Sequence, residues 1–456
     1  MALSRGAPAP KTSDLLLVFT RFPDPGKVKT RLIPAFGPEG AARLQFLMTR
    51  HLLHQVRELP SGVRVEVHHD GGTPGLMSAL FGEDVNPVPQ TGQGLGSRMA
   101  LALRRGLDQG AGRAVLVGSD CPSIDVRLLN RAFAELRSHD VVLGPAADGG
   151  YYLVGLNSRI SGRLGALFTG IDWGSDRVLT QTRHKAAEQG WTVAQVETLP
   201  DIDHPGDVSR VPQTVLSPRV ASLSVVIPVL NEAANLGPTL QSLSSGTEVE
   251  VLVVDGGSRD ATVQVAERAG ARVLFSGPGR GRQMNVGARA AQGASVFFLH
   301  GDSQAPFLYD WYIRQALGRA GVAGGSFSFG FEQPFAGARL IAAMTNIRSQ
   351  WLGLPYGDQG LFVSKPLFFE CGGFRETPLL EDVHLVKAMK ARGRVVTLPA
   401  PVLTSARRWT RLGLIRTTLI NQIIMAGYLL RVPEPHLARL YGRLRALSRQ
   451  RGQKPR

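Results

Sequence analysis

Acidic residues follow short apolar runs at three places in the second half of the chain. Asp255 and two glycines follow residues 251–254, Asp302 follows residues 296–299, and Glu381 and Asp382 follow a pair of leucines. A carboxylate at the end of a buried strand can accept hydrogen bonds from a nucleobase or a ribose, and glycines allow close approach. Several such carboxylates also suit Mg²⁺ or Mn²⁺ bridging a diphosphate. Turn chemistry and favourable placement at a helix dipole are the structural alternatives for each acid taken singly.

A basic loop follows the first apolar run of the chain. The segment TRFPDPGKVKTRL, residues 20–32, contains four residues whose backbone amides or cationic side chains could wrap phosphates: Gly26, Lys27, Lys29 and Arg31. The spacing of a Walker ATPase loop is absent, so that class is disfavoured. We therefore expect a phosphate-binding loop of another kind.

The first half contains further acidic residues that could bind a metal ion, and one cysteine beside them. Asp120 follows the apolar run 115–117 and, with Asp203, would form a two-carboxylate metal site. Asp148, Asp201 and Asp207 lie in nearby motifs, and helix capping explains Asp201 and Asp207 equally well. The segment GQGLGSRM, residues 92–99, could contact a nucleobase or phosphates. Cys121 has no evident histidine base, so we interpret it as a packed side chain.

The elements that must position these residues alternate between strand and helix. Continuous apolar runs predict strands at 15–20, 63–68, 114–117, 141–143, 223–230, 249–254, 272–275 and 296–299. Helical patterns between them include residues 40–58 and 262–269. This alternation indicates doubly wound α/β sheets, with binding crevices at the C-terminal ends of the strands.

The pattern of strands and helices restarts after a linker-like stretch. Residues 209–222 contain two prolines and several small polar residues without a strong period. We therefore predict two tandem Rossmann-like domains, at 1–208 and 223–409, separated by this linker. A basic helical tail would occupy residues 410–456.

Length, cysteine content and charge narrow the class of protein. A chain of 456 residues predicts two or three domains, and 19% charged with 43% hydrophobic residues is typical of a globular protein. Two cysteines, no visible signal peptide and no long apolar span favour the cytoplasm. Residues 223–456 contain 28 basic and 15 acidic residues, so most of the net charge of +16 lies there. Few aromatic residues accompany the basic tail, which disfavours nucleic acid as a partner.

The motifs of the second half, taken in order, carry a resemblance. SVVIPVLNE, VVDGGSRDAT, FFLHGDS, GDQGLFV and LLEDV resemble an inverting family 2 glycosyltransferase of the GT-A fold over about residues 223–409. The resemblance is strongest to bacterial enzymes labelled as arsenosugar-biosynthesis glycosyltransferases, and some relatives carry a carotenoid-acid glycosyltransferase label. It implies a nucleotide-sugar donor, expected to be UDP-linked, a hydroxyl acceptor and Mg²⁺ or Mn²⁺.

The resemblance also assigns roles to individual residues. Glu232 and Asp255 would hold the uridine, and Asp302 would bind the metal and diphosphate. Asp382, beside Glu381, would be the base that deprotonates the acceptor hydroxyl, as inversion requires. His300 stands where the common D-x-D motif has its first acid.

The remaining roles concern positive charge and the acceptor. Arg280 and Arg282 are candidates to neutralise the leaving diphosphate, because guanidinium groups match phosphate oxygens; an exposed basic loop is the alternative. Asp358 could bind the acceptor near the base. SARRW, residues 405–409, resembles an acceptor-side motif, which gives Arg408 and Trp409 that role although Ser405 replaces its usual first residue.

The first half resembles a second bacterial family of GT-A-like glycosyltransferases, also linked by name to arsenosugar biosynthesis. It is more distantly similar to phospholactate guanylyltransferases, and the resemblance covers about residues 14–208. Three interpretations stay open: two glycosyltransferase domains, an N-terminal nucleotidyltransferase that makes the donor for the second domain, or a non-catalytic nucleotide-binding scaffold.

The tail allows two interpretations. Residues 412–432 are apolar but interrupted by Arg416, Asn421 and Gln422, which disfavours a spanning helix. Apolar area followed by arginines is typical of an element that lies on an anionic membrane, which would place the protein at the inner face of the cell membrane with a lipid-like acceptor. Packing of this segment against the catalytic domain, with solvated arginines, is the alternative.

Overall fold

The chain folds into two compact units, Met1–Arg219 and Val220–Arg456. Its structure, a computed structural model, describes residues 14–333, 335–406, 414–430 and 432–451. The division falls inside the predicted linker 209–222. Part of that stretch is folded, however, because helix α6, Gln213–Leu216, packs on α1, Ile33–Arg57, and Val211 and Val215 are buried. The first unit thus extends beyond residue 208.

The first unit is built on a seven-stranded sheet with the order β3-β2-β1-β4-β6-β5-β7. Only β6 among these strands runs antiparallel to its neighbours. The bounds of the strands are Asp14–Arg21 for β1, Val63–Asp70 for β2, Pro87–Pro89 for β3, Arg113–Gly118 for β4, Val141–Pro145 for β5, Tyr151–Asn157 for β6 and Val193–Gln195 for β7.

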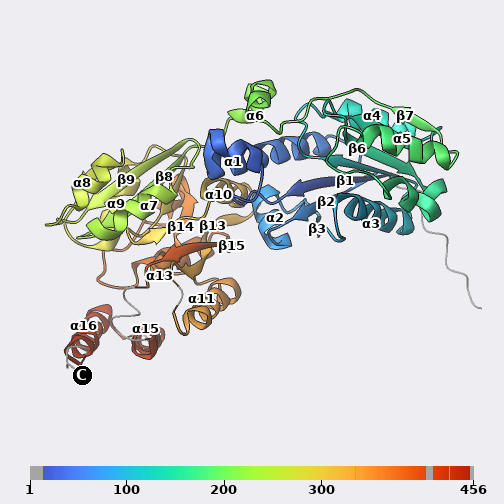
Figure 1. Ribbon diagram of the computed structural model, residues 1–456. Coiled ribbons are helices and arrows are strands. Elements are labelled where there is room, and N and C mark those ends of the chain that lie inside the picture. The colour runs from blue at the N-terminus through green and yellow to red at the C-terminus, as the bar shows by residue number, and fades with distance from the viewer. Residues whose placement is uncertain (1–13, 334, 407–413, 431, 452–456) are drawn as a thin grey trace, which may run out of the picture. The chain divides into compact units, whose positions relative to one another are not determined.

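Helices cover both faces of this sheet (Figure 1). They are α1, α2 at Pro74–Phe81, α3 at Leu95–Asp108, α4 at Val126–Glu135 and α5 at Val178–Glu188, with 3-10 turns η1 at Thr30–Leu32, η2 at Ser158–Phe168 and η3 at Pro205–Arg210. Leu15 and Leu17 of β1 share a core with Leu103 of α3 and Leu164 of η2. The intervening Leu16 and Val18 are also fully buried. Burial on both faces explains why β1 is a continuous apolar run.

The second unit repeats the arrangement in an eight-stranded sheet with the order β10-β9-β8-β11-β14-β13-β15-β12. In both sheets the first strand lies between the second and a later parallel strand, and an antiparallel strand follows. The bounds are Leu223–Val229 for β8, Val249–Asp255 for β9, Arg272–Phe275 for β10, Ser295–Phe298 for β11, Ser303–Gln304 for β12, Val322–Phe331 for β13, Leu361–Ser364 for β14 and Arg394–Thr404 for β15.

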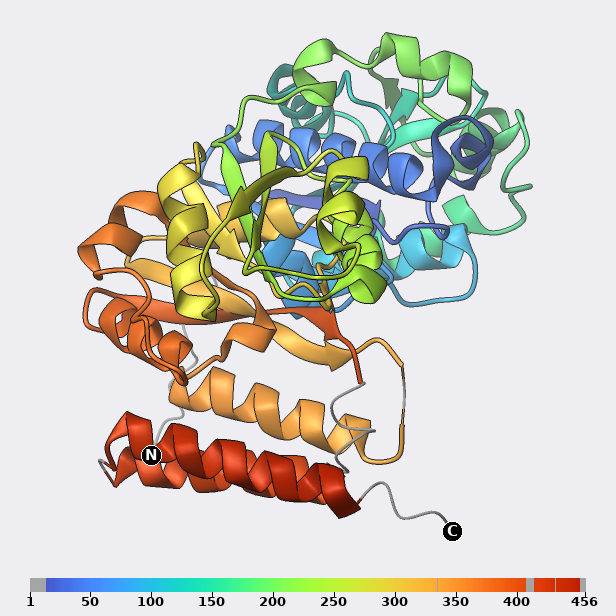
Figure 2. The same cartoon turned by 90° about the vertical axis from the view of Figure 1, so that its left-hand side faces the viewer.

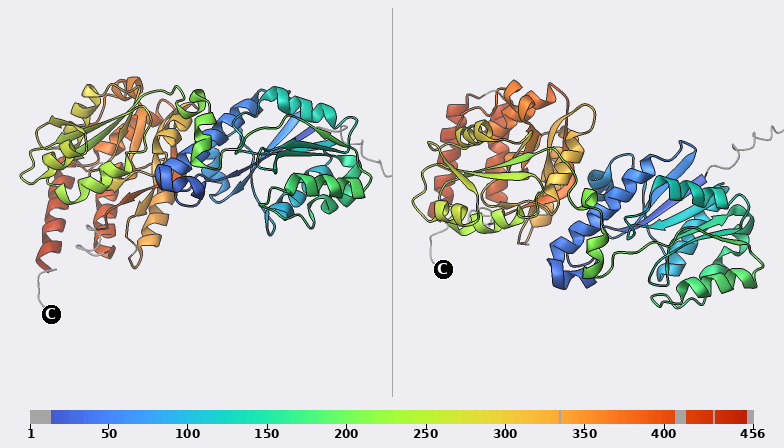
Figure 3. Two further views of the ribbon diagram at one scale, coloured as in Figure 1. Left: turned by 45° about the horizontal axis from the view of Figure 1, so that its top comes forward. Right: turned by 90° about the horizontal axis from the view of Figure 1, so that it is seen from above.

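Two layers of helices enclose the second sheet (Figure 3). They are α7 at Ala233–Ser242, α8 at Thr262–Arg268, α9 at Arg280–Ala290, α10 at Tyr309–Leu317, α11 at Ala338–Leu352, α12 at Lys365–Glu370 and α13 at Glu381–Lys390, with η4 at Gly357–Gln359. On one face, Met284 of α9 and Val386 of α13 pack in a core with Phe298. On the other, Phe297 stacks on Tyr309 of α10 with ring centroids 5.8 Å apart.

The tail forms two helices, α15 at Leu414–Leu429 and α16 at Glu434–Arg451. Among the residues that the structure describes, no helix combines the length and the apolar character needed to cross a membrane. The predicted α/β class with alternating strands and helices is confirmed. Among the strands that were not predicted are β6 and β14, which run antiparallel to their neighbours.

Candidate functional site

Three strand ends meet at one edge of the second sheet. Strands β9, β8 and β11 are parallel neighbours, so their C-terminal ends face the same side. Asp255 is the last residue of β9, and Glu232 and Asp302 follow shortly after β8 and β11. The structure therefore places these three predicted residues at the same edge of the sheet.

The loops after β8 and β9 are bound to each other by hydrogen bonds. The Asn231 N–H donates to Ser258 Oγ at 2.9 Å, and the Arg259 N–H donates to Asn231 Oδ1 at 2.9 Å. The Glu232 N–H donates to Thr262 Oγ1 at 2.8 Å. Asn231 holds a left-handed φ of 57°, which asparagine tolerates better than most residues. These bonds fix Glu232 relative to Asp255.

Asp255 presents one oxygen that has no hydrogen-bond partner in the described part of the chain. Its Oδ2 accepts the N–H groups of Gly257 and Ser258 at 2.8 and 2.9 Å, whereas its buried Oδ1 accepts no hydrogen bond from the described residues. Such an atom is costly to leave unpaired, so it marks a place where a donor is missing. The strand ends beside it are held by Gln283 Nε2, which donates to the carbonyls of Val229 and Val254, both at 2.8 Å.

Asp302 is held close to strand β8 because its neighbour Gly301 packs on that strand. A Cβ on Gly301 would lie 2.9 Å from Val229 Cγ1 and 3.7 Å from Glu232 Cγ. The Asp302 carbonyl accepts the N–H of Ser405, and Ser303 Oγ lies 2.6 Å from Thr404 Oγ1 in the adjoining pair of strands. This close packing keeps half-buried Asp302 near Glu232.

Asp382 and His300 converge on Gly357, although the three residues are far apart in sequence. The Gly357 N–H donates to Asp382 Oδ2 at 2.7 Å. A Cβ on Gly357 would lie 3.0 Å from His300 Nε2 and 3.5 Å from Asp382 Oδ2. Leu380, two residues before Asp382, holds a φ of 64°, a strained value of the kind found at functional sites.

Arg280 and Arg282, the two arginines predicted to contact the diphosphate, both have acidic neighbours. Arg280 Nη1 lies 3.5 Å from Glu381 Oε1, and burial, followed by the charge of Asp382, raises the pKa of Glu381. Arg282 Nε lies 3.9 Å from Glu376 Oε2, and both side chains are more than half exposed. The structure thus brings Arg280 to Glu381, one of the two acids predicted to be catalytic, but pairs Arg282 with an acid that was not part of the predicted site.

The turn that contains Asp358 is held by residues that the sequence did not single out. Gln359 is fully buried; its Oε1 accepts from Arg348 Nη2 at 3.3 Å, and its Nε2 donates to the Phe327 carbonyl at 3.1 Å. The Arg348 guanidinium lies 3.4 Å from the centroid of the Tyr356 ring. Burial raises the pKa of Tyr356; Arg348 opposes that shift, and the charges of Asp382 and Asp358 add to it.

The predicted acceptor residues Arg408 and Trp409 lie outside the described residues. In the described part of the chain, no three His, Cys, Asp or Glu side chains gather closely enough to hold a metal ion by themselves. An ion at Asp302 would therefore take its other ligands from phosphate oxygens or water, which is usual for Mg²⁺.

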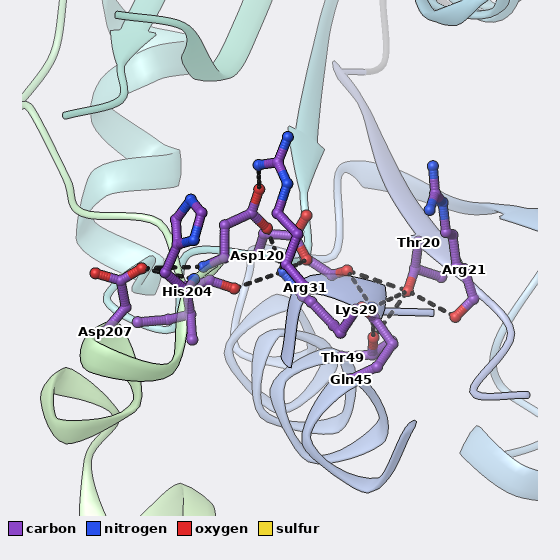
Figure 4. Close-up of polar contacts among 12 residues, drawn as sticks. Thr20, Arg21, Lys29, Arg31, Gln45, Thr49, Asp120, His204 and Asp207 are labelled. Atoms are coloured by element: carbon purple, nitrogen blue, oxygen red, sulfur yellow. Dashed lines mark hydrogen bonds and ion pairs between the residues drawn. The ribbon is translucent and has the colours of Figure 1, made fainter. Parts of the chain in front are cut away.

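A second polar site occupies the equivalent edge of the first sheet (Figure 4). The buried Lys29 ammonium lies 2.8 Å from Asp120 Oδ1 and 3.0 Å from Asp203 Oδ1, and donates to the Ile202 carbonyl at 2.7 Å. Burial opposes the charge of Lys29, but the carboxylates outweigh it and raise its pKa. The structure thus brings Asp120 and Asp203 together, but the Lys29 ammonium lies between them at the position where the sequence predicted a metal ion.

The rest of the predicted phosphate loop is more exposed. Lys27 pairs with Asp24 at 2.6 Å on the surface, and Arg31 Nη1 lies 3.1 Å from Asp203 Oδ2. Gly26 has a φ of 83°, with no atom within 4 Å of a built Cβ. The sequence predicted that Lys29 would contact phosphate, whereas in the structure its ammonium contacts the carboxylates of Asp120 and Asp203.

Two structural alternatives raised by the sequence are confirmed in the first unit. Asp207 is a cap, because its Oδ2 accepts the His204 N–H at 2.8 Å. Cys121 is buried, and burial, followed by the charge of Asp120, raises its pKa, so it is a poor nucleophile. The sequence missed a buried network beneath Lys29, in which Gln45 Nε2 donates to Ser119 Oγ at 2.9 Å and Thr20 Oγ1 lies 2.8 Å from Thr49 Oγ1.

Comparison with known families identifies a domain in each unit. Residues 224–375 match the model of glycosyl transferase family 2. Residues 52–175 match an uncharacterised family conserved in bacteria, DUF2064. The chain joins a DUF2064 domain to a family 2 glycosyltransferase domain. The expected fusion of two GT-A-like domains is thereby confirmed. Glu381 and Asp382 lie just beyond the matched stretch of the second domain.

Individual relatives resemble parts of the chain. The glycosyltransferase AglE of Haloferax volcanii is 30% identical over 141 residues, which are 28% of this chain and 46% of that protein. A glucosyl-3-phosphoglycerate synthase of Mycolicibacterium paratuberculosis is 29% identical over 147 residues, 29% of this chain and 39% of that protein. The chain therefore spans less than half the length of these curated relatives. The crystal structure of a candidate nucleotide-diphospho-sugar transferase from Desulfovibrio desulfuricans G20 is 32% identical, with a TM-score of 0.40, and covers 42% of this chain and 83% of that one.

Proposed function

We propose that the second unit is an inverting glycosyltransferase that moves a sugar from a UDP-sugar to an acceptor hydroxyl. The observation that carries this proposal is the buried Oδ1 of Asp255, which lacks a donor among the described residues at the edge where three parallel strands end. The imide N–H of uracil or a ribose hydroxyl would supply that donor. The match of this unit to glycosyl transferase family 2 supports the same chemistry.

Each residue around Asp255 would contact a different part of the UDP-sugar. Glu232, fixed by the interlocked loops, would share the nucleoside with Asp255. Asp302 would hold Mg²⁺ or Mn²⁺, whose charge helps to neutralise the leaving diphosphate. Its carboxylate is half-buried beside Glu232, and phosphate oxygens would complete the ligand set. Arg280 is half-exposed and would add positive charge near the diphosphate.

Asp382 is the base in this proposal. Its Oδ2 accepts the Gly357 N–H, which fixes the position of the carboxylate. Inversion needs one carboxylate that removes the proton of the acceptor hydroxyl as that oxygen attacks the anomeric carbon. Asp358 would contact the acceptor from the adjoining turn. Glu381 would stay beside Arg280, where burial favours its protonated form.

The donor assignment can be tested by calorimetry with UDP and UDP-glucose on the whole chain. Asp255→Asn should weaken UDP binding about 10- to 100-fold, because a hydrogen bond to a charged group is worth about 1.5–3 kcal/mol. Glu267→Gln, at an exposed position of α8, is the matched control and should bind normally. Equal affinities of parent and Asp255→Asn would remove the assignment.

For the first unit we propose a nucleoside-phosphate site beside Lys29, favoured by the partly exposed carboxylates of Asp120 and Asp203, which would hold Mg²⁺ or Mn²⁺ on a phosphate, and by the exposed Arg31 guanidinium next to Asp203. Such a site serves both a glycosyltransferase and a nucleotidyltransferase that makes the donor. In the Asp255→Asn background, where UDP binding to the second unit is weakened, titration with nucleoside triphosphates and Mn²⁺ should still give heat. Product analysis would then distinguish pyrophosphate release from sugar transfer.

A further inference from the structure

Exposed apolar side chains gather on three helices of the second unit. Fifteen large hydrophobic side chains are exposed in the described part of the chain, and nine of them lie on α11, on α15, on α16 or between the last two. These nine are Leu340, Met344, Ile347, Trp351, Leu419, Ile423, Leu430, Val432 and Leu440. The three helices lie on one side of the unit with nearly parallel axes (Figures 1 and 2).

Helix α11 carries an apolar stripe that faces outward. Leu340, Met344, Ile347 and Trp351 are spaced by four, three and four residues, which places them within about 60° around the helix. Their exposed fractions range from 50% to 83%, with Trp351 the most exposed. In a water-soluble protein such a stripe normally packs against the core. The outward-facing stripe of α11 is therefore suited to contact another apolar surface.

The α15–α16 hairpin adds a second stripe. Ile420 and Ile424 are buried, and a Cβ on Gly427 would lie 2.5 Å from Leu437 Cδ2, so one face of α15 packs inward. Leu419 and Ile423 lie one residue earlier in each turn and are exposed. The hairpin is therefore apolar both toward the protein and toward its surroundings.

The sequences of α11 and of the tail are almost entirely positive in charge. Residues 400–456 contain twelve basic residues and one acid, Glu434, and α11 contains no acid. Glu434 Oε1 lies 2.6 Å from His384 Nε2 of α13, so its charge is directed at the protein. Arg439 and Arg443 of α16 are exposed. A second copy of this face would oppose positive charge with positive charge, which disfavours self-association.

We propose that α11, α15 and α16 form a docking face that lies in the surface of an anionic lipid bilayer. An interfacial element combines apolar area at the headgroup boundary with arginines that meet lipid phosphates, and an exposed tryptophan suits that depth. Each basic residue near such a surface adds about 1 kcal/mol, or about fivefold in affinity.

The docking face is bonded to the helix that carries Asp382 and to the turn that carries Asp358. Lys387 Nζ of α13 donates to Tyr428 Oη of α15 at 3.0 Å, and α13 begins with Glu381 and Asp382. Arg348 of α11 binds Gln359, next to Asp358. If the proposed function holds, on which this step rests, the bilayer would present its acceptor hydroxyl close to Asp382.

Vesicle co-sedimentation of the whole chain tests the docking face without requiring activity. Vesicles of phosphatidylcholine with 30% phosphatidylglycerol would be compared with pure phosphatidylcholine, at about 0.05 and 0.5 M NaCl, where surface charges are screened very differently. We expect binding to the anionic vesicles that weakens with salt. Arg439→Gln/Arg443→Gln should bind about 30-fold more weakly at low salt, and Ile347→Gln/Trp351→Gln should also lose binding.

Two controls make the result specific. Arg268→Gln/Arg289→Gln removes the same charge from α8 and α9, and Phe275→Gln removes another exposed aromatic side chain; both should bind as the parent does. Absence of binding at low salt, or equal losses in the controls, would overturn the proposal. A dimer in light scattering that Ile347→Gln/Trp351→Gln dissolves would overturn it in favour of a second copy. UDP calorimetry on the same samples reports separately whether the proposed donor site fails.

Discussion

The backbone N–H of Gly357 donates a 2.7 Å hydrogen bond to Asp382 Oδ2 across 25 residues of sequence. His300 Nε2 would lie 3.0 Å from a Cβ at the same glycine. Gly357 has no left-handed φ, so the site needs glycine for space rather than for backbone freedom. The bond and the space together fix where the carboxylate of the proposed base lies.

Gly357→Ala tests that geometry. The added methyl group meets His300 and Asp382 and should displace the carboxylate, and a shift of about 1 Å at a reacting group can cost about 10²-fold in rate. UDP release from a UDP-sugar should fall steeply, whereas UDP affinity should stay near that of the parent. Gly237→Ala in α7, where a Cβ meets nothing within 4 Å, is the control. A Gly357→Ala enzyme with full turnover would show that this geometry is unimportant.

Asp382→Asn tests the base itself. The amide keeps the shape of the side chain but cannot take the acceptor proton, so transfer should fall about 10²-fold or more while UDP binding persists. Turnover and calorimetry would be measured on the same preparation. Glu376→Gln, at the exposed pair with Arg282, should leave both unchanged. Asp382 is not the base if the asparagine variant transfers sugar at the parental rate.

Asp302→Ala tests the metal. Mn²⁺ should strengthen UDP binding in the parent, because the ion links the carboxylate to the diphosphate. The variant should lose most of that enhancement and keep the affinity measured in EDTA. Calorimetry with and without Mn²⁺ gives both values. A parent whose UDP affinity does not respond to Mn²⁺ or Mg²⁺ would contradict the assignment.

Lys29→Met should destabilise the first unit by about 3 kcal/mol, the lower end for breaking a buried ion pair, because Asp120 and Asp203 are partly exposed and can be hydrated. Lys27→Met, which removes an exposed ammonium, should cost less than about 1 kcal/mol. Calorimetric unfolding would compare both variants with the parent. Equal transitions for Lys29→Met and the parent would contradict the role of the buried pair.

The same group predicts a pH dependence. The folded-state pKa of Lys29 lies above its ordinary 10.5, so its stabilisation is complete below that value and is lost as pH rises through the folded-state pKa. Burial opposes the ionised form of Asp203, but Lys29 lowers its pKa overall, so its stabilisation is lost only as pH falls below about 3.8. The unfolding midpoint of the parent should therefore drop in strong alkali, and Lys29→Met should show a smaller drop. A drop of equal size in both would exclude Lys29 as its source.

Local patterns in the sequence were enough to predict eight of the strands, and for those buried on both faces, such as β1, the reason is that nearly every position must be apolar. The acids after those strands could be placed at one crevice, because parallel neighbours end at the same edge. Asp255 and Asp302 were found in this way. The role of Lys29 was not, because the loop that carries it gives no sign that its ammonium turns inward toward residues some 90 and 170 positions later.

Sequence by itself thus determined the two α/β halves, the order of their motifs and the positive tail, all of which depend on composition and short-range period. Tertiary structure alone decided which distant residues meet: Gly357 with Asp382, Arg348 with Gln359, and Glu434 with His384. It also turned the apolar stripe of α11 outward, where its spacing alone would place it in a core. The physical reason is that periodicity reports which side chains share a face, whereas packing of the whole chain decides what that face meets.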